Sequence, residues 1–452
     1  NVHRRHQQTA QPNIDMKLPD MHRDILRIAL PSIASNIMVP LLGLIDMNLV
    51  GHLGSPSYIG AIALSSTLFN MMYWLFAFLR MGTTGLSAQA FGRNDREELI
   101  AILLHSALVA LCIGLAIIVI HPLILQGLNA YAGDTAIHAA RYFGICIWGA
   151  PAVLGLYSLT GWFIGIQEAR YPLYIALLQG LTNIAASLFF VYELHYGIGG
   201  VALGTLTAQY AGLAVATGWA VRHCRRQAHD GFPPLRRLWE KVNFNAFFTV
   251  NRDIFFRTLC LIGVTGAFTF FGMRQGETVL AVNAVLMQFF TLYSFFMDGF
   301  AFAAEALSGR QFGAGQSAGL QHTVKALFRW GGIMALLTTL LYIGGGKVLV
   351  ALLTDQESVR TAALPYLPWV WVIPIAGMAA FLWDGIFIGL TATFEMLVSM
   401  AWATLVFFSV HLLLQDSGGN HALWLSFVLY LAVRGGIQTF LYRRLKRNRL
   451  GL

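Results

Sequence analysis

Residues 85–94 have the sequence GLSAQAFGRN, and residues 306–315 repeat its pattern as ALSGRQFGAG. The identical Leu, Ser, Phe and Gly of the two segments recur at one spacing of 221 positions. A second motif, GWFIG at 161–165, returns as GIFIG at 385–389 with a spacing of 224. Self-similarity at almost the same spacing indicates an internal repeat of about half the chain.

The composition places this repeat in a membrane. Of the 452 residues, 57% are hydrophobic and only 11% are charged, whereas an ordinary soluble domain has about 25% charged residues. These values exclude a soluble globule and intrinsic disorder, and they predict an integral membrane protein. The four cysteines lie apart, without the spacing of metal ligands, and we expect no metal centre from them.

Apolar runs of about 20 residues, each long enough to cross a bilayer as a helix, alternate with polar or glycine- and proline-containing breaks. The twelve runs that we predict as spans are 28–51, 58–80, 99–121, 141–166, 171–192, 199–220, 253–273, 278–304, 324–350, 361–390, 396–415 and 421–441. Because each half has an even number of spans, the halves are parallel repeats. We therefore predict an all-α membrane protein with two six-helix lobes.

The predicted organisation follows from these spans and from the positions of the basic residues. Of the 30 Lys and Arg residues, 24 lie on the side of the amino terminus, which places both termini in the cytoplasm and the protein in the cytoplasmic (inner) membrane. Lipid headgroups account for the net charge of +9, so we expect no nucleic-acid partner. The predicted segments are a tail (1–27), a first lobe (28–221), a linker (222–250), a second lobe (251–442) and a basic tail (443–452).

Parallel repeats of this kind are typical of secondary transporters. The segment GGGK at 344–347 lacks the spacing and the Ser or Thr of a phosphate-binding loop. The thirteen histidines form no HExxH motif, which argues against a membrane-embedded metalloenzyme. We therefore predict a transporter that is not an enzyme, uses no cofactor and is driven by an ion gradient or runs downhill.

Asp46 is the acid that stands out in the first half, because it lies inside the first span after Pro31 and Pro40. An ionisable side chain in hydrocarbon is costly and indicates function, and the prolines give the helix a place to bend. We interpret Asp46 as a proton or cation acceptor. Asn183 and Thr205 add neutral oxygens on the fifth and sixth spans.

The second half has ionisable residues of its own. Asp298 and Glu305 are seven positions apart, so they share one helix face, and Arg257 is an available counter-charge together with Arg80 of the first half. We expect buried ion pairs that hold helices in register. Asp384 is the second-half acid that we expect to face the cavity.

Small organic molecules are the expected cargo, because aromatic and methionine side chains with few fixed polar groups suit bulky amphipathic compounds. We expect a monomer in contact with membrane lipids. The predicted cavity residues are Phe69, Tyr73, Trp74, Tyr157, Met287, Gln288 and Tyr293.

Several longer segments together carry a resemblance to a known family. They include IDMNLVGHLG (45–54), RMGTTGLSAQAFGRND (80–95), NRDIFFRTL (251–259), DGFAFAAEALSG (298–309) and DGIFIG (384–389). With these segments the sequence resembles a multidrug and toxic compound extrusion (MATE) transporter, most similar to the DinF-like branch. The resemblance implies a cation-coupled antiporter that exports organic, often cationic or amphipathic, compounds through a V-shaped pair of six-helix lobes.

Three residues match the family's ion-coupling positions. Asp46 matches the carboxylate of the first helix, Asn183 the asparagine of the fifth, and Thr205 the hydroxyl of the sixth. The family often has an aspartate four residues after that asparagine, where this chain has Ser187. A lone carboxylate favours proton coupling, with a sodium site at Asp46, Asn183, Ser187 and Thr205 as the alternative. A lipid-linked precursor flippase of the same superfamily is the other alternative.

Overall fold

The computed structural model describes residues 18–51, 56–129, 134–227, 233–241 and 244–449, and helices dominate throughout these ranges. The first half contains α1 (Leu18–Gly51), α2 (Pro56–Leu75), α3 (Phe78–Gly92), α4 (Arg96–Asn129), α5 (Asp134–Cys146), α6 (Ala150–Gly165), α7 (Arg170–Leu188) and α8 (Ile198–Gln227). A short helix α9 (Leu235–Lys241) follows. The second half contains α10 (Phe244–Arg274), α11 (Glu277–Gly313), α12 (Ser317–Leu353), α13 (Glu357–Ala363), α14 (Leu367–Gly389) and α15 (Thr393–Arg449).

Ten helical segments within the described residues are long and apolar enough to cross a membrane. Three predicted spans each consist of consecutive pieces: α2 with α3, α5 with α6, and α13 with α14. The last two predicted spans lie in α15, whose backbone is non-helical at Gly419 (φ 50°, ψ −127°). Counting α1 and both arms of α15 gives the predicted twelve spans, and the prediction of an all-helical membrane protein is confirmed.

The internal repeat is visible in the turns that follow each motif. After the Phe–Gly pair of the first motif (Phe91–Gly92), the backbone turns at Asn94 (φ 56°). It turns again 221 positions later, at Gly315 (φ 69°). After the other motif it turns at Gln167 (φ 65°) and, 224 positions later, at Thr391 (φ 51°). Equivalent backbone hydrogen bonds close the turns, such as Asn94 N–H to Phe91 O (3.1 Å) and its counterpart in the second half (3.0 Å). Equivalent turns direct the next helix in the same way in both halves.

The glycines of the second motif explain how each half packs. Gly161 and Gly165 on α6 lie so close to α3 that an added Cβ would overlap the Arg80 carbonyl and the Ser87 side chain. In the second half, Gly385 of α14 lies equally close to the Ala301 carbonyl of α11, and the last glycine of the motif contacts α11 in the equivalent manner. Small residues let membrane helices approach closely where the hydrophobic effect does not drive them together.

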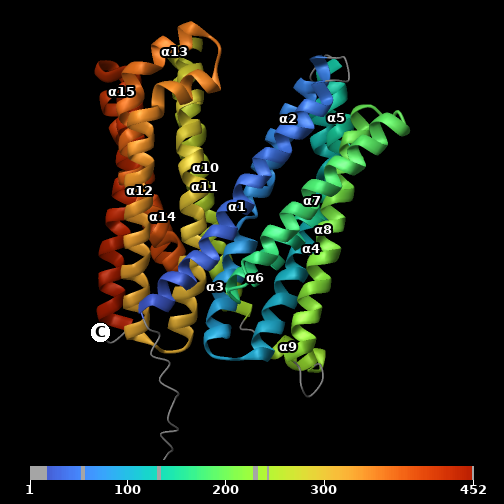
Figure 1. Cartoon of the computed structure of the whole chain (residues 1–452), viewed down its shortest axis with the longest axis vertical. Helices are drawn as coiled ribbons and strands as arrows, with labels where there is room; N and C mark the ends of the chain where they lie inside the picture. The colour runs from blue at the N-terminus through green and yellow to red at the C-terminus, as the bar shows by residue number, and fades with distance from the viewer. Residues whose placement is uncertain (1–17, 52–55, 130–133, 228–232, 242–243, 450–452) are drawn as a thin grey trace, which may run out of the picture.

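Figure 1 shows two groups of helices that lean apart toward one end and approach each other at the other end. The second-half helices α10 to α15 form one group, which we call the C bundle; the first-half helices α2 to α8 form the N bundle. Helix α1 runs obliquely between them, in contact with α11 and with α7. The carboxyl end of the chain and α9 lie at the end where the bundles meet, and we call this the closed end.

Helix α9 belongs structurally to the N bundle. Lys241 forms an ion pair with Asp95 (3.0 Å), and Arg237 forms one with Glu97 (3.1 Å). Trp239 stacks on His105 of α4 with a centroid distance of 4.6 Å. Acidic residues near the amino end of α4 are favourable for its dipole, and they also fix the segment that links the two halves.

Candidate functional site

Three of the predicted ion-coupling residues form one hydrogen-bonded cluster between α7 and α8. The Asn183 amide donates to Thr205 Oγ1 (3.3 Å), and the Ser187 hydroxyl donates to Asn183 Oδ1 (3.3 Å). Ser187 is fully buried, and Gly204 leaves it room because a Cβ there would overlap its hydroxyl. These three groups are neutral. The side chain of Asp46, the fourth predicted member, lies outside the described residues, although its backbone belongs to α1.

A second polar cluster lies inside the C bundle around Asp384 of α14. Its carboxylate accepts hydrogen bonds from Arg257 of α10 and from Arg434 of α15. Gln438, one helical turn after Arg434, donates to Asp384 Oδ1 (2.6 Å). The Asp384 side chain is only 9% exposed. A buried charge held in this way is a structural centre, because losing one partner leaves the others uncompensated.

This geometry corrects one expected pairing. Arg257 pairs with Asp384 and not with the acids of α11, since α10 and α14 both face α15 at this level. Arg434 and Gln438 were missed by the sequence reasoning. The sequence feature that could have indicated this cluster is Arg434, a cation within an apolar run that has no acidic residue nearby in the sequence.

Arg80, one of the two expected counter-charges, pairs with Glu305, and this ion pair joins the two bundles. Two guanidinium nitrogens of Arg80 on α3 donate to the Glu305 carboxylate on α11, at 3.0 and 3.3 Å. The guanidinium also lies 4.1 Å from the centre of the Phe302 ring. Asp298, two turns earlier on α11, is partly buried and makes no hydrogen bond or ion pair within the described part of the chain.

The repeated FG motif forms the rest of the contact between the bundles. Gly92 of α3 lies against the carbonyl of Arg310, and the equivalent Gly313 of α11 lies against the carbonyl of Gln89; an added Cβ would overlap either oxygen. The Gln89 amide donates to Thr391 Oγ1 (3.1 Å). Its counterpart Arg310 donates to Gln167 Oε1 (3.1 Å), in the equivalent turn of the N bundle. The closed end is therefore a pseudo-twofold contact of the repeat with itself.

The predicted cavity residues have different environments. Phe69 and Tyr73 are buried against each other, and Phe69 also stacks on Phe143. Tyr293 is fully buried in the C-bundle core, where its hydroxyl donates to Pro374 O (2.7 Å). Trp74 and Gln288 are exposed, whereas Tyr157 and Met287 are partly buried. Within the described residues, no group of three or more His, Cys, Asp or Glu side chains could hold a metal ion.

Comparison with known proteins identifies the family. The MatE family model matches residues 31–189 and again residues 254–414. The chain belongs to the MATE family. One match in each half agrees with the internal repeat, and together they cover well over half of this MATE protein. It is therefore a multi-pass membrane transporter of the multidrug and toxic compound type, from a family of ion-coupled antiporters and not of enzymes.

Relatives cover nearly the whole MATE chain. The "DNA damage-inducible protein F" of Escherichia coli (strain K12) is 38% identical over 434 residues, covering 95% of this chain and 94% of the relative. A "Probable multidrug resistance protein NorM" of Thermotoga maritima is 22% identical over 71% of this chain and 69% of the relative. The DinF-like resemblance is thus confirmed.

Solved structures confirm the MATE fold. A MATE crystal structure in the bent conformation has a TM-score of 0.84 at 18% identity, covering 96% of this chain and 98% of the other. A multidrug resistance MATE transporter of the MOP superfamily, described as outward-facing, has a TM-score of 0.83 at 19% identity, covering 96% and 97%. The two-bundle arrangement of Figure 1 is thus a MATE arrangement.

Proposed function

We propose that this MATE transporter is a proton-coupled antiporter that exports organic, amphipathic or cationic compounds across the cytoplasmic membrane, with both termini in the cytoplasm. The observation that carries the proposal is the neutral cluster of Asn183, Ser187 and Thr205 in the N bundle. Asp46 of α1 is then the charged group of this ion-coupling site. A proton on Asp46 removes the only formal charge that these four side chains have.

The chemistry of the cluster favours a proton over sodium. Hard cations prefer several oxygen ligands with carboxylates among them, and here one carboxylate would be assisted only by neutral amide and hydroxyl oxygens. A protonated carboxyl group becomes a hydrogen-bond donor with fewer acceptor sites than the ionised form. Protonation of Asp46 would therefore change the hydrogen bonds of its carboxyl group and let α1 bend at Pro31 or Pro40. The bend would contract the cavity of the first lobe, so that cargo leaves.

With cytoplasmic termini, the closed end faces the cytoplasm and the bundles lean apart toward the outside. The structure then corresponds to the state that releases cargo outward. The lobes at 28–221 and 251–442 must separate at the Arg80–Glu305 contact for cargo to enter from the cytoplasm. Alternating access in this protein is the exchange between these two arrangements.

The test is flux in proteoliposomes, with the fluorescent cation ethidium as probe and a pH dye inside. Ethidium should drive proton movement in the wild type, and Asp46→Asn should abolish it. Asp355→Asn is the matched control, because this exposed acid lies in the turn between α12 and α13. Normal ethidium–proton exchange by Asp46→Asn refutes the proposal.

The coupling ion is tested by changing Ser187. Asp at this position stands one turn from Asn183 and supplies the second carboxylate that many relatives have. We expect Ser187→Asp to acquire ethidium flux driven by a sodium gradient at fixed pH, which the wild type should lack. Sodium-driven flux in the wild type would establish the sodium alternative. Movement of a lipid-linked precursor without ion dependence would favour the flippase.

A further inference from the structure

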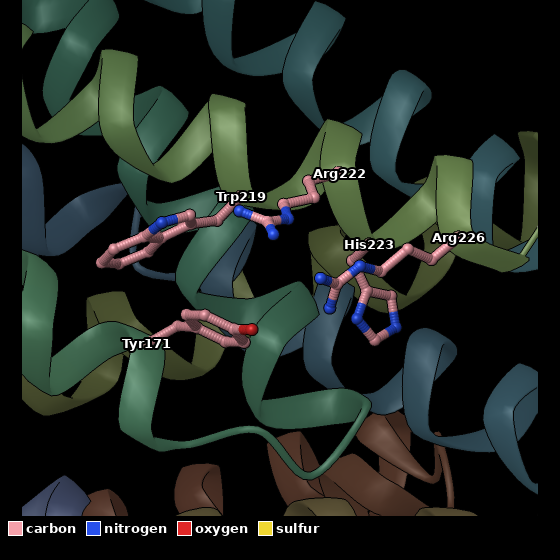
Figure 2. Close-up of a pocket in the computed structure, with 5 residues that line it drawn as sticks. All are labelled: Tyr171, Trp219, Arg222, His223 and Arg226. Carbon is pink, nitrogen blue, oxygen red and sulfur yellow. The ribbon is translucent and has the colours of Figure 1, made fainter.

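One face of α8 carries an uninterrupted stripe of aromatic and basic side chains near the closed end. Trp219, Arg222, His223 and Arg226 have the spacing i, i+3, i+4 and i+7, which places all four on one side of the helix. Together with Tyr171 of α7 they line a cavity of about 210 Å³. Figure 2 shows the Tyr171 hydroxyl and both guanidinium groups turned toward the same space between the helices, with the imidazole beside the Arg226 guanidinium.

The aromatic wall of this cavity is fixed by packing. The Trp219 ring lies 5.1 Å from the Tyr171 ring and 6.4 Å from Tyr174, by centroid distance. The imidazole of His223 meets the buried Trp162 edge-on at 5.4 Å. The rings therefore fix one wall of the cavity, and the two exposed arginines complete its lining.

The two arginines of the cavity are unpaired within the described part of the chain. Arg222 and Arg226 have no ion pair or hydrogen bond to any residue in the described ranges. Glu168, the nearby acid in the turn before α7, is paired with Arg27 (3.7 Å). Two guanidinium groups and a phenol hydroxyl thus present donors to one space, whereas the His223 imidazole interacts electrostatically with Glu168.

The size and position of the cavity restrict what it binds. Pockets for drug-sized molecules are roughly 300 to 1,000 Å³, so this cavity is too small for the cargo. Arginine forks match phosphate oxygens in pairs. The apolar part of α8 ends just before Arg222, and Trp and Tyr at this level are typical of the membrane–water interface. A phosphate group at this depth belongs to a lipid.

We propose that this cavity, the α7–α8 headgroup pocket, binds the phosphodiester of an anionic phospholipid such as phosphatidylglycerol. Arg222 and Arg226 hold the phosphate oxygens, Tyr171 donates a further hydrogen bond, and Trp219 lies against the glycerol and upper acyl chain. This site is separate from the neutral cluster of α7 and α8 and does not depend on the coupling ion.

The test is native mass spectrometry of the full chain in detergent, titrated with phosphatidylglycerol, with phosphatidylcholine, or with inorganic phosphate. Because each basic group near anionic lipid contributes about 1 kcal/mol, Arg222→Gln/Arg226→Gln should weaken phosphatidylglycerol binding roughly thirtyfold. Arg443→Gln/Arg444→Gln is the matched control. It removes two exposed arginines at the same end of the molecule, and its affinity should stay within about twofold of the wild type.

Selective binding of phosphatidylglycerol that only the pocket variant loses supports the proposal. Displacement of the lipid by inorganic phosphate, in the wild type alone, would show that the pocket takes a free phosphate and would overturn the lipid assignment. Equal weakening by both double variants would show general surface attraction and would overturn the pocket itself. Arg222→Lys/Arg226→Lys is a second variant, which keeps both charges but removes the planar guanidinium groups that bind two phosphate oxygens at once. It should lose only part of the affinity for phosphatidylglycerol.

Discussion

The ion pair between Arg80 and Glu305 is the buried charge contact across the closed end, and its removal should open that end. Arg80→Met leaves Glu305 without a counter-charge, while a similar apolar length continues to contact Phe302. The cost applies only while α3 and α11 touch, because water reaches the carboxylate once the bundles separate. The substitution should therefore shift the equilibrium between the two arrangements.

The magnitude follows from the burial of the pair. The side chains of Arg80 and Glu305 are 12% and 2% exposed, so water screens their interaction little. Removing one member of a buried pair costs about 3 to 5 kcal/mol. At 1.4 kcal/mol per tenfold, the ratio of closed to open molecules should fall by between roughly a hundredfold and several thousandfold.

The assay is the distance between two spin labels in nanodiscs, measured by pulsed electron resonance. Arg170→Cys at the start of α7 and Ala318→Cys at the start of α12 place labels on exposed positions of the two bundles. The four native cysteines are first replaced. The wild-type chain should give mainly the short distance, and Arg80→Met mainly a longer one.

The double variant Arg80→Met/Glu305→Met should restore the short distance, since two apolar side chains replace a buried pair at little cost. Arg93→Met is the control, because it removes a partly exposed pair with Glu98 inside the N bundle. The reasoning is refuted if Arg80→Met keeps the wild-type distance, or if the single and double variants open equally.

Three further substitutions test other parts of the fold. Gly313→Ala should lengthen the same spin-label distance, because its Cβ overlaps backbone of α3, whereas Gly263→Ala, with open space around it, should have no effect. Burial alone would raise the pKa of Asp95, but the α4 backbone N–H and Lys241 outweigh it and lower that pKa. The attachment of α9 should therefore persist above about pH 4 and weaken as pH falls further. This appears as faster hydrogen exchange in α9, with a smaller dependence on pH in Asp95→Asn, where the ion pair of Glu97 with Arg237 remains. Asp384→Asn leaves two buried guanidinium groups unpaired and should lower the free energy of unfolding by about 3 to 5 kcal/mol, measured by thermal or denaturant unfolding, and an unchanged midpoint would contradict a structural role.

The fold was largely predictable because its information is local and repeated. Apolar runs of the length of a bilayer indicated the spans, and the FG motif with its spacing of 221 indicated the two halves. The turn at Asn94 and the turn at Gly315 even have the residue types that positive φ favours. The positive φ at Thr391 could not be predicted in this way, because a β-branched residue rarely adopts this backbone conformation.

The partners of buried charges were less predictable, because they depend on which helices become neighbours. Arg80 and Glu305 were among the residues expected to pair, but their assignment to each other required the contact of α3 with α11. Arg257 had several acids within its half, and its pairing with Asp384 required the packing of α10 and α14 against α15. Arg434 had to be placed in three dimensions before it had a partner. Sequence therefore indicated that these charges needed partners without deciding which.

The closed end combines symmetric packing with one asymmetric charge contact. Gly92 and Gly313 make equivalent contacts, but Glu305 has Thr84 as its equivalent in the first half, so the ion pair with Arg80 occurs once and not twice. The intact pair contributes little net free energy to closure, because water solvates both charges once the bundles separate. Packing of small residues alone holds helices together weakly but specifically. One ion pair added to that packing fixes the alignment of α3 and α11 without strongly stabilising it. Closure therefore stays reversible, which a transporter that must open at both ends requires.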